Sequence, residues 1–262
     1  MKRLSFILNY LIYRFKSVNE HGVHSPFEFE LLLSTIYNKK KFYAYLPIEK
    51  LRGSLSLSRQ EITCIDLGAG SAVNNQTTKS VQTILYAAAK PPKYSQLLFR
   101  LINQFQPETI LELGTSLGIS TAYMASANSK SQLITIEGCK EVAAVAKKNF
   151  KELELKNIEQ VVGNFDEVLP DVLKNIPQLD FVFFDGNHRK QPTLNYFKQC
   201  LEKANEQSVF VFDDINWSDE MKEAWQEIKN HERVTVTIDL FFMGIVFFRK
   251  EQVKEHFVIR YY

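Results

Sequence analysis

The sequence predicts an α/β fold in which a mostly parallel, seven-stranded sheet carries helices on both faces. From Thr109 onward, short apolar runs alternate five times with amphipathic segments, a pattern typical of parallel strands joined by helices. The last two apolar runs, RVTVTIDLFF and MGIVFFRKE, follow each other almost directly and predict a C-terminal antiparallel hairpin. Five parallel strands and this hairpin make up the seven strands.

The first residues, MKRLSFILNYLIYRFK, predict an amphipathic helix. We expect it to pack on the body of the protein, with contact to a membrane surface as the alternative. The run is too short to span a bilayer. It also returns to Arg14 and Lys16 without a small-residue cleavage site, which argues against a signal peptide.

Further helices are predicted before the alternating region. In SPFE, at residues 25–28, a serine can cap a helix whose first turn accepts the proline. VQTILYAAAK and YSQLLFRLINQF predict two more helices, separated by Pro91-Pro92, which neither helix can contain. We therefore predict a helical extension or lid at residues 1–92 and an α/β domain at residues 93–262.

In the α/β region, every predicted strand is followed by a predicted helix. The strands are mostly continuous apolar runs, as expected where helices cover both faces of a parallel sheet. They are TILEL, QLITIE, IEQVV, DFVFFD and SVFVFDD, and the helices after them are ISTAYMASA, KEVAAVAKKNF, DEVLPDVLKN, QPTLNYFKQCLEKA and DEMKEAWQEIKN.

The composition excludes some classes of partner. The 32 basic and 30 acidic side chains nearly cancel, and no basic block indicates a nucleic-acid partner. The three cysteines, Cys64, Cys139 and Cys200, are far apart in the sequence and form no CxxC motif. Because the count is odd, we expect no disulfide scaffold and a reducing, cytoplasmic compartment.

Two glycine-containing stretches resemble nucleotide-binding turns. IDLGAGSAV, at residues 65–73, has a plausible short strand, ITCI, before it but no amphipathic helix directly after it. Pro91 stands 25 residues after Asp66, where an acid at a strand end would be needed. A turn or loop that requires small residues is the expected role of this stretch.

ILELGTSLGIST, at residues 110–121, has the full context of a ligand-binding turn. A strand delivers Glu112, Gly114 and Gly118 allow the backbone to turn closely, and a helix is predicted from about Ile119. The next strand ends at Glu137, 25 residues after Glu112, where a carboxylate can accept hydrogen bonds from two ribose hydroxyls. The stretch predicts a site for a nucleotide-like ligand.

The glycine pattern is G-x-x-x-G rather than the G-x-G-x-x-G of dinucleotide sites. Residues 93–250 resemble the Rossmann-like class I S-adenosylmethionine-dependent methyltransferases, and most of all their catechol-type O-methyltransferase branch. ILELGTSLGIST, LITIEGCKEVA, VVGNFDEVLP, DFVFFDGNHRK and VFVFDDINW carry the resemblance. It implies S-adenosyl-L-methionine as the cofactor.

The resemblance also implies roles for residues at the strand ends. Glu137 would hold the ribose, and Asn164 and Phe165 would lie against the adenine, with Asp166 near its amino group. Asp185 closes the fourth strand and would face the methyl-transfer site as a catalytic and cofactor-binding residue. The methionine end of the cofactor would be surrounded by Glu112, Gly114, Thr115, Ser116, Gly118 and Ser120. Ser116 departs from the commonest motif, which has glycine there.

A metal site is a further implication of the resemblance. The catechol-type branch holds magnesium with an aspartate after the fourth strand and an Asp-Asn pair after the fifth. Here Asp185 and, 28 residues later, Asp213-Asp214 stand at these places, and Asp214 keeps an oxygen ligand in place of asparagine. They would bind Mg²⁺ or another divalent cation. A metal-free substrate pocket, or capping of the helix near Ser218, is the alternative.

Three histidines are considered as candidate site residues. His188 is a candidate general base, with a surface-loop histidine as the alternative, and Lys190 is a second candidate. His21 and His24 in HGVHSPF lack a third ligand, so we interpret them as turn and capping residues rather than zinc ligands.

These features predict methyl transfer to a small-molecule acceptor, at a hydroxyl oxygen or, as the open alternative, at nitrogen. A binding or scaffold protein without catalysis and an aminopropyl transferase are alternatives on the same fold. An NAD-dependent reductase would need a phosphate-binding loop that we do not find. No nucleic acid and no stable membrane insertion are expected, and a homodimer stays open. The sequence does not identify the acceptor.

Overall fold

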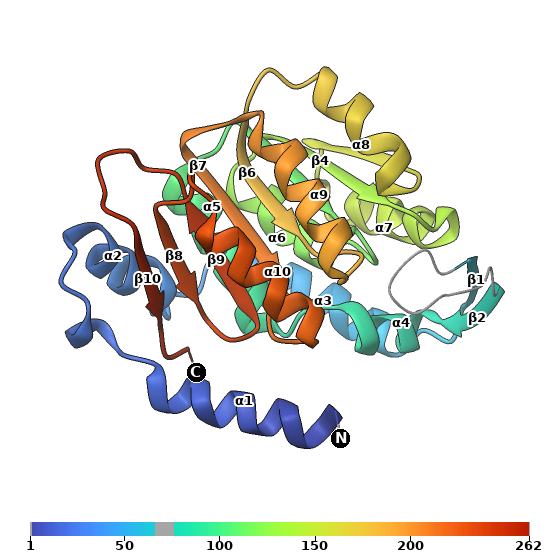
Figure 1. The fold of residues 1–262 in the computed structure, drawn as a ribbon. Helices are drawn as coiled ribbons and strands as arrows, with labels where there is room; N and C mark the ends of the chain where they lie inside the picture. Colours follow the sequence, from blue (N-terminus) through green and yellow to red (C-terminus); the bar gives the residue numbers. More distant parts are fainter. Residues whose placement is uncertain (1, 66–75, 262) are drawn as a thin grey trace. The chain divides into compact units, whose positions relative to one another are not determined.

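The structure is a computed structural model that describes residues 2–65 and 76–261 (Figure 1). Its residues form two compact units. The central unit runs from Lys39 to Ile176, and the terminal unit combines the chain up to Asn38 with the chain from Pro177 onward. Each unit contains its own strands and helices. The predicted boundary at residue 92 stays a prediction.

The sheet of the central unit contains three parallel strands in the order β3, β4, β5. The strands are β3 (Thr109–Leu113), β4 (Gln132–Glu137) and β5 (Ile158–Val162), and the helices that follow them in turn are α6 (Ile119–Ala127), α7 (Lys140–Glu152) and α8 (Phe165–Lys174). The register pairs Glu112 with Thr135 and Glu137 with Val162. Because the strands are parallel, the turns that follow them gather at one edge of the sheet.

The central unit begins with α3 (Tyr45–Ser56), β1 (Glu61–Ile65), β2 (Gln76–Ser80), α4 (Val81–Ala88) and α5 (Pro92–Phe105). The two helices predicted on either side of Pro91-Pro92 are confirmed as α4 and α5, with Pro92 as the first residue of α5. The expected short strand ITCI is confirmed as part of β1. The expectation of a mostly helical segment omitted β2, which pairs antiparallel with β1, Glu61 with Ser80 and Ile65 with Gln76. Its β-branched residues favour strand pairing.

The terminal unit has five strands in the order β10, β8, β9, β7, β6. These are β6 (Leu179–Phe184), β7 (Ala204–Asp213), β8 (Val236–Asp239), β9 (Met243–Phe247) and β10 (Glu255–Val258), with α9 (Lys190–Leu201) after β6 and α10 (Asp219–Asn230) after β7. β6 and β7 are parallel, and β8 and β9 form the predicted antiparallel hairpin. The four-residue β10 pairs in parallel with β8 and was not predicted.

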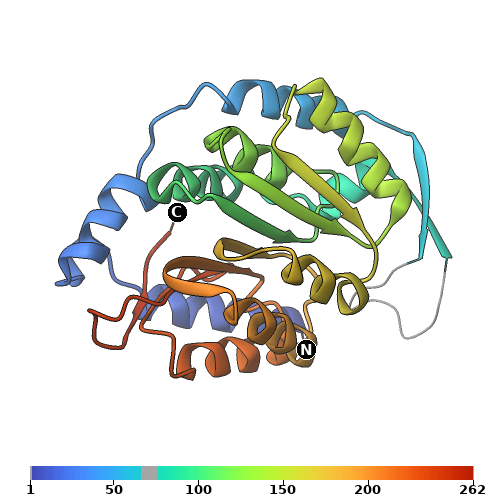
Figure 2. The ribbon, with the colours of Figure 1, turned by 90° about the horizontal axis from the view of Figure 1, so that it is seen from above.

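Helices cover both faces of the strands in the terminal unit (Figures 1 and 2). On one face, Phe197 of α9 and Trp225 of α10 contact Phe212 of β7. On the other face, Phe27 contacts Phe247 edge-on, with ring centroids 5.4 Å apart. Phe27 belongs to α2 (Pro26–Leu31), which lies between two short helices, η1 (Glu20–Gly22) and η2 (Leu32–Ile36). The predicted α/β class, with mostly parallel strands flanked by helices, is confirmed.

The first helix, α1 (Lys2–Lys16), packs on the turn between β8 and β9. Phe241 in this turn has a left-handed backbone, with φ of 71°, which is unfavourable for a bulky residue. The rings of Phe6, Tyr10 and Tyr13 surround it at centroid distances of 5.0 to 5.3 Å. Contacts among these four aromatic rings, of which Tyr13 and Phe241 are buried, offset the backbone strain. None of the described helices is long and apolar enough to cross a membrane.

Candidate functional site

The turn after β3 has the backbone that the glycine pattern predicted. Gly114 and Gly118 have φ of 109° and 80°, in the region that favours glycine. A Cβ on Gly118 would lie 2.4 Å from Cε1 of Phe150, so a side chain is excluded by space as well. Ser116 is also left-handed, with φ of 48°. This explains why glycine is the commonest residue at its place in the motif.

Glu137 joins this turn to the turn after β4. Its Oε2 accepts a hydrogen bond from the backbone N–H of Ser116 at 2.8 Å, and its Oε1 accepts one from the N–H of Cys139 at 2.9 Å. Two backbone donors, one on each oxygen, therefore fix the orientation of the carboxylate. This arrangement suits a ligand with two adjacent hydroxyls. The structure thus brings together Ser116 and Glu137, which are 21 positions apart and were both predicted site residues.

Glu112 lies beneath the turn and is fully buried. Its Oε2 accepts hydrogen bonds from the hydroxyls of Thr121, at 2.5 Å, and Thr135, at 2.7 Å. Thr115, which was among the predicted residues, contacts the hydroxyl of Thr135 at 2.6 Å. Sequence reasoning missed Thr121 and Thr135. The parallel register, in which Thr135 stands opposite Glu112, would have identified one of them. Ser120 is buried in the first turn of α6.

The residues predicted at the adenine lie at the start of α8. The side chain of Asn164 caps this helix by accepting a hydrogen bond from the N–H of Asp166 at 3.1 Å. Phe165 is the first helical residue, and it is half-buried. The N–H of Gly163 donates to the carbonyl of Glu137, so this turn lies beside the end of β4. The turns after β3, β4 and β5 are thus gathered at one edge.

A second cluster lies in the terminal unit, at the ends of β6 and β7. Ligand atoms of Asp185, His188 and Asp213 all lie within 4.8 Å of one another. Nε2 of His188 is 3.8 Å from Oδ1 of Asp185 and 3.9 Å from Oδ2 of Asp214, distances of ion pairs rather than of hydrogen bonds. Asp213 is buried, and Asp214 has a left-handed backbone with φ of 53°. The structure therefore brings the predicted metal and catalytic residues together.

The donor set of this cluster fits a divalent cation. Carboxylate oxygens are the ligands that Mg²⁺ prefers, and an imidazole widens the choice toward Mn²⁺ or Zn²⁺. Lys190, the second candidate base, has a different role. Hydrogen bonds to Glu227 and Glu223 of α10, at 2.7 and 2.9 Å, raise the pKa of its amine and keep it protonated. Among the described residues, two groups could hold a metal ion: the Asp185 cluster and a group of Cys64, Cys139 and Glu141. His21 and His24 belong to neither group.

Comparison with known proteins identifies the region that carries these clusters. Residues 111–215 match the family model described as a methyltransferase domain. The chain is 31% identical over 147 residues to a catechol O-methyltransferase of Niastella koreensis, across 55% of this chain and 64% of the relative. The chain therefore spans less than two thirds of that relative's length.

Solved structures confirm the predicted α/β fold. The O-methyltransferase TomG from Streptomyces achromogenes, in complex with SAM, superposes with a TM-score of 0.58 and 20% identity, over 85% of this chain and 95% of that one. The O-methyltransferase from Bacillus cereus, in complex with SAH, gives 0.57 and 18%, over 80% and 93%. At 18% and 20% sequence identity, these two superpositions are evidence for the fold alone.

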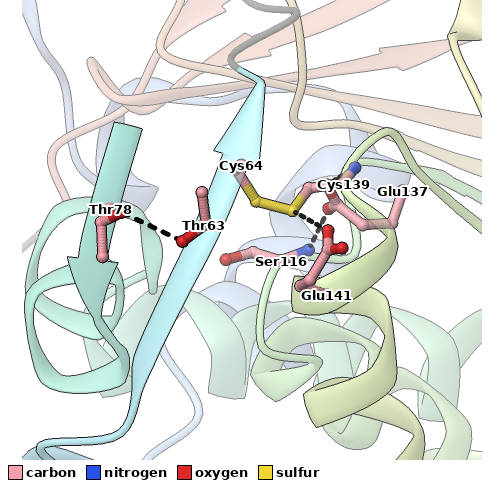
Figure 3. The surroundings of a disulfide bond; sticks show 7 residues. All are labelled: Thr63, Cys64, Thr78, Ser116, Glu137, Cys139 and Glu141. Atoms are coloured by element: carbon pink, nitrogen blue, oxygen red, sulfur yellow. Dashed lines mark hydrogen bonds between the residues drawn. A yellow bond between two sulfur atoms is a disulfide. The ribbon is translucent and has the colours of Figure 1, made fainter. Parts of the chain in front are cut away.

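One expectation about the cysteines was wrong. Cys64 of β1 and Cys139, the residue before α7, form a disulfide bond (Figure 3). They are 75 residues apart in the sequence, but β1 packs against α7. An odd cysteine count indicates only that one thiol is left over, and that thiol is Cys200. Cys200 is buried, and burial raises its pKa.

The disulfide lies beside Glu137, because Cys139 is one of the two residues whose N–H binds its carboxylate (Figure 3). The other glycine stretch, IDLGAGSAV, falls almost wholly within residues 66–75, outside the described part of the chain. Its flanking strands, β1 and β2, pair with each other, so it lacks the strand-to-helix context of the turn at residues 113–119. Its predicted role stays a prediction.

Proposed function

We propose that this protein transfers a methyl group from S-adenosyl-L-methionine to a hydroxyl oxygen of a small-molecule acceptor, with a divalent cation at the Asp185 cluster. The observation that carries the proposal is the carboxylate of Glu137, fixed through both oxygens by backbone N–H groups. A vicinal diol such as ribose offers two donors to such a carboxylate at once.

The remaining parts of the cofactor match the surrounding turns. The ammonium and sulfonium groups carry positive charge, and the buried carboxylate of Glu112 offers compensating charge under the turn of Gly114, Ser116 and Gly118. Asn164 and Phe165 would border the adenine, and the exposed Asp166 would accept a hydrogen bond from its amino group. These assignments extend the resemblance residue by residue.

The acid cluster would bind and activate the acceptor. Asp185, Asp213 and Asp214 would hold the cation, which supplies Lewis acidity that favours the deprotonated acceptor hydroxyl. His188, placed between two carboxylates, would accept the hydroxyl proton, and those carboxylates would stabilise the imidazolium that results. The acceptor oxygen then forms a bond to the methyl carbon while the carbon–sulfur bond breaks and S-adenosylhomocysteine leaves. The protein contributes alignment and charge.

Calorimetric titration with S-adenosylhomocysteine, with and without Mg²⁺, tests the proposal. The wild type should bind in both conditions. Glu137→Gln should weaken binding about 10- to 100-fold, because a charge-assisted pair of hydrogen bonds is lost. Glu141→Gln, an exposed acid in the first turn of α7, is the matched control and should bind like the wild type. Binding of NADH but not of S-adenosylhomocysteine would contradict the proposal, as would unchanged affinity of Glu137→Gln.

Three expectations remain predictions within this proposal: a cytoplasmic location, the absence of a nucleic-acid partner, and a homodimer as an open option. The disulfide removes the cysteine argument for a reducing compartment. In a reducing compartment, the Cys64–Cys139 bond would be expected to be transient.

A further inference from the structure

The helix α1 is apolar on two opposite faces. Phe6, Tyr10 and Tyr13 form one stripe, at the i, i+4, i+7 spacing of one helix face, and this stripe packs on Phe241. The opposite stripe contains five large apolar side chains that are exposed: Ile7, Leu8, Leu11, Ile12 and Phe15. Their exposed fractions range from 44% for Ile12 to 92% for Phe15. We call these five residues the outer stripe.

The outer stripe is bordered by positive charge. Successive residues on a helix are about 100° apart, which places Arg14 and Lys16 about 80° to either side of the packed stripe, at the two borders of the outer stripe. The sequence of α1 contains four basic residues, Lys2, Arg3, Arg14 and Lys16, and no acidic residue. At the end of α1, Arg260 donates hydrogen bonds to the carbonyls of Arg14 and Ser17, which adds a further cation there.

We propose that α1 docks this protein on an anionic lipid surface. The outer stripe would enter the boundary between headgroups and acyl chains, and Arg14 and Lys16 would contact headgroup phosphates. An exposed apolar stripe flanked by basic residues is the pattern of helices that lie in the membrane interface. At 15 residues, α1 is about 22 Å long and lies along a surface rather than crossing it.

Charge favours a lipid surface over a second copy of this chain. If two copies of α1 paired through their outer stripes, all the charged side chains that α1 brings to the contact would be basic, because α1 has no acidic residue. Like charges at a contact oppose association. Anionic headgroups neutralise the same side chains.

Flotation with vesicles tests the proposal. The wild-type chain should bind vesicles of phosphatidylcholine mixed with phosphatidylglycerol, and it should bind vesicles of phosphatidylcholine alone at least about tenfold more weakly. Leu11→Gln/Phe15→Gln should lower the partition coefficient at least about tenfold, because two apolar side chains no longer leave water. Gln retains good helix propensity, and both positions are exposed, so the variant should unfold at the wild-type temperature.

The matched control is Leu46→Gln/Leu57→Gln, which changes two side chains of the central unit that are 77% and 80% exposed. It should bind vesicles like the wild type. The proposal is overturned if the wild type does not float with anionic vesicles, if both lipid mixtures bind it equally, or if both double variants lose binding equally. It is also overturned if ultracentrifugation shows a wild-type dimer that Leu11→Gln/Phe15→Gln converts to a monomer while vesicle binding is unchanged. None of these outcomes depends on cofactor binding.

Discussion

The turn around Glu137 and the cluster around His188 differ in how their carboxylates are held. In the turn, one carboxylate is held by two backbone N–H groups, so its geometry is set by the fold of the central unit. In the cluster, two carboxylates lie at ion-pair distance from one imidazole, and a third, Asp213, lies within 4.8 Å of it. Like charges this close repel one another unless a cation or proton joins them. The turn thus positions one carboxylate through the backbone, whereas the cluster gathers several carboxylates, which a proton or a cation would stabilise.

The substitution with the largest expected effect, at Asp213, separates cofactor binding at the turn from metal binding at the cluster. Asp213→Asn should lower methyl transfer at least about 100-fold and abolish binding of Mn²⁺ measured by calorimetry, because it removes a buried charge from the cluster. Affinity for S-adenosylhomocysteine should stay within about twofold of the wild type, since Asp213 is not among the cofactor-binding residues. Asp219→Asn, at an exposed aspartate in the first turn of α10, is the control. Equal loss of cofactor and metal binding by Asp213→Asn would contradict the division of roles.

The disulfide tests how firmly the turn is held. Cys64→Ser should lower the free energy of unfolding by about 2 to 4 kcal/mol, because it opens a cross-link between residues 75 positions apart. Denaturant titration measures this change. A reductant should destabilise the wild type by a similar amount and leave Cys64→Ser unchanged. Three free thiols in the natively purified protein would contradict the predicted cross-link.

Gly118 offers the smallest and sharpest test of the turn. Gly118→Ala should lower the free energy of unfolding by about 1 to 3 kcal/mol, because the new methyl group meets Phe150 and the backbone is left-handed. Gly53→Ala in α3 is the matched control. A Cβ there contacts nothing within 4 Å, so it should be neutral or stabilising by up to about 1 kcal/mol. Equal stability of the two variants would show that the turn tolerates a side chain at Gly118.

The sequence predicted those features that are encoded locally. Gly114, Gly118 and Glu137 were identifiable because a close turn requires glycine and because strand ends gather at one edge of a parallel sheet. Asp185, His188 and Asp213 were selected by the resemblance, and the structure brings their side chains together. Their assignment to metal or to proton transfer stays a prediction, because geometry alone does not determine which cation binds.

Features that depend on long-range packing were missed. The disulfide requires β1 to lie against α7, which no pattern around Cys64 or Cys139 indicates. Thr135 meets Glu112 through the register of the folded sheet, and Thr121 reaches the same carboxylate from α6. The strand β10 was missed because its four residues are too few to show a clear alternation of apolar and polar side chains. It is recognised as a strand only by its pairing with β8.

The attachment of α1 has a consequence for the order of folding during synthesis. The hydroxyl of Tyr13 donates to the carbonyl of Ile259 at 2.6 Å and accepts from the N–H of Tyr261, and Val18 pairs with Ile259 in an isolated bridge. The hydrogen bonds of Tyr13 therefore form only after residues 258–261 have been synthesised, about 246 residues after Tyr13 itself. Such distant partners delay docking, so nascent α1 stays apolar on both sides until its partners in the terminal unit emerge.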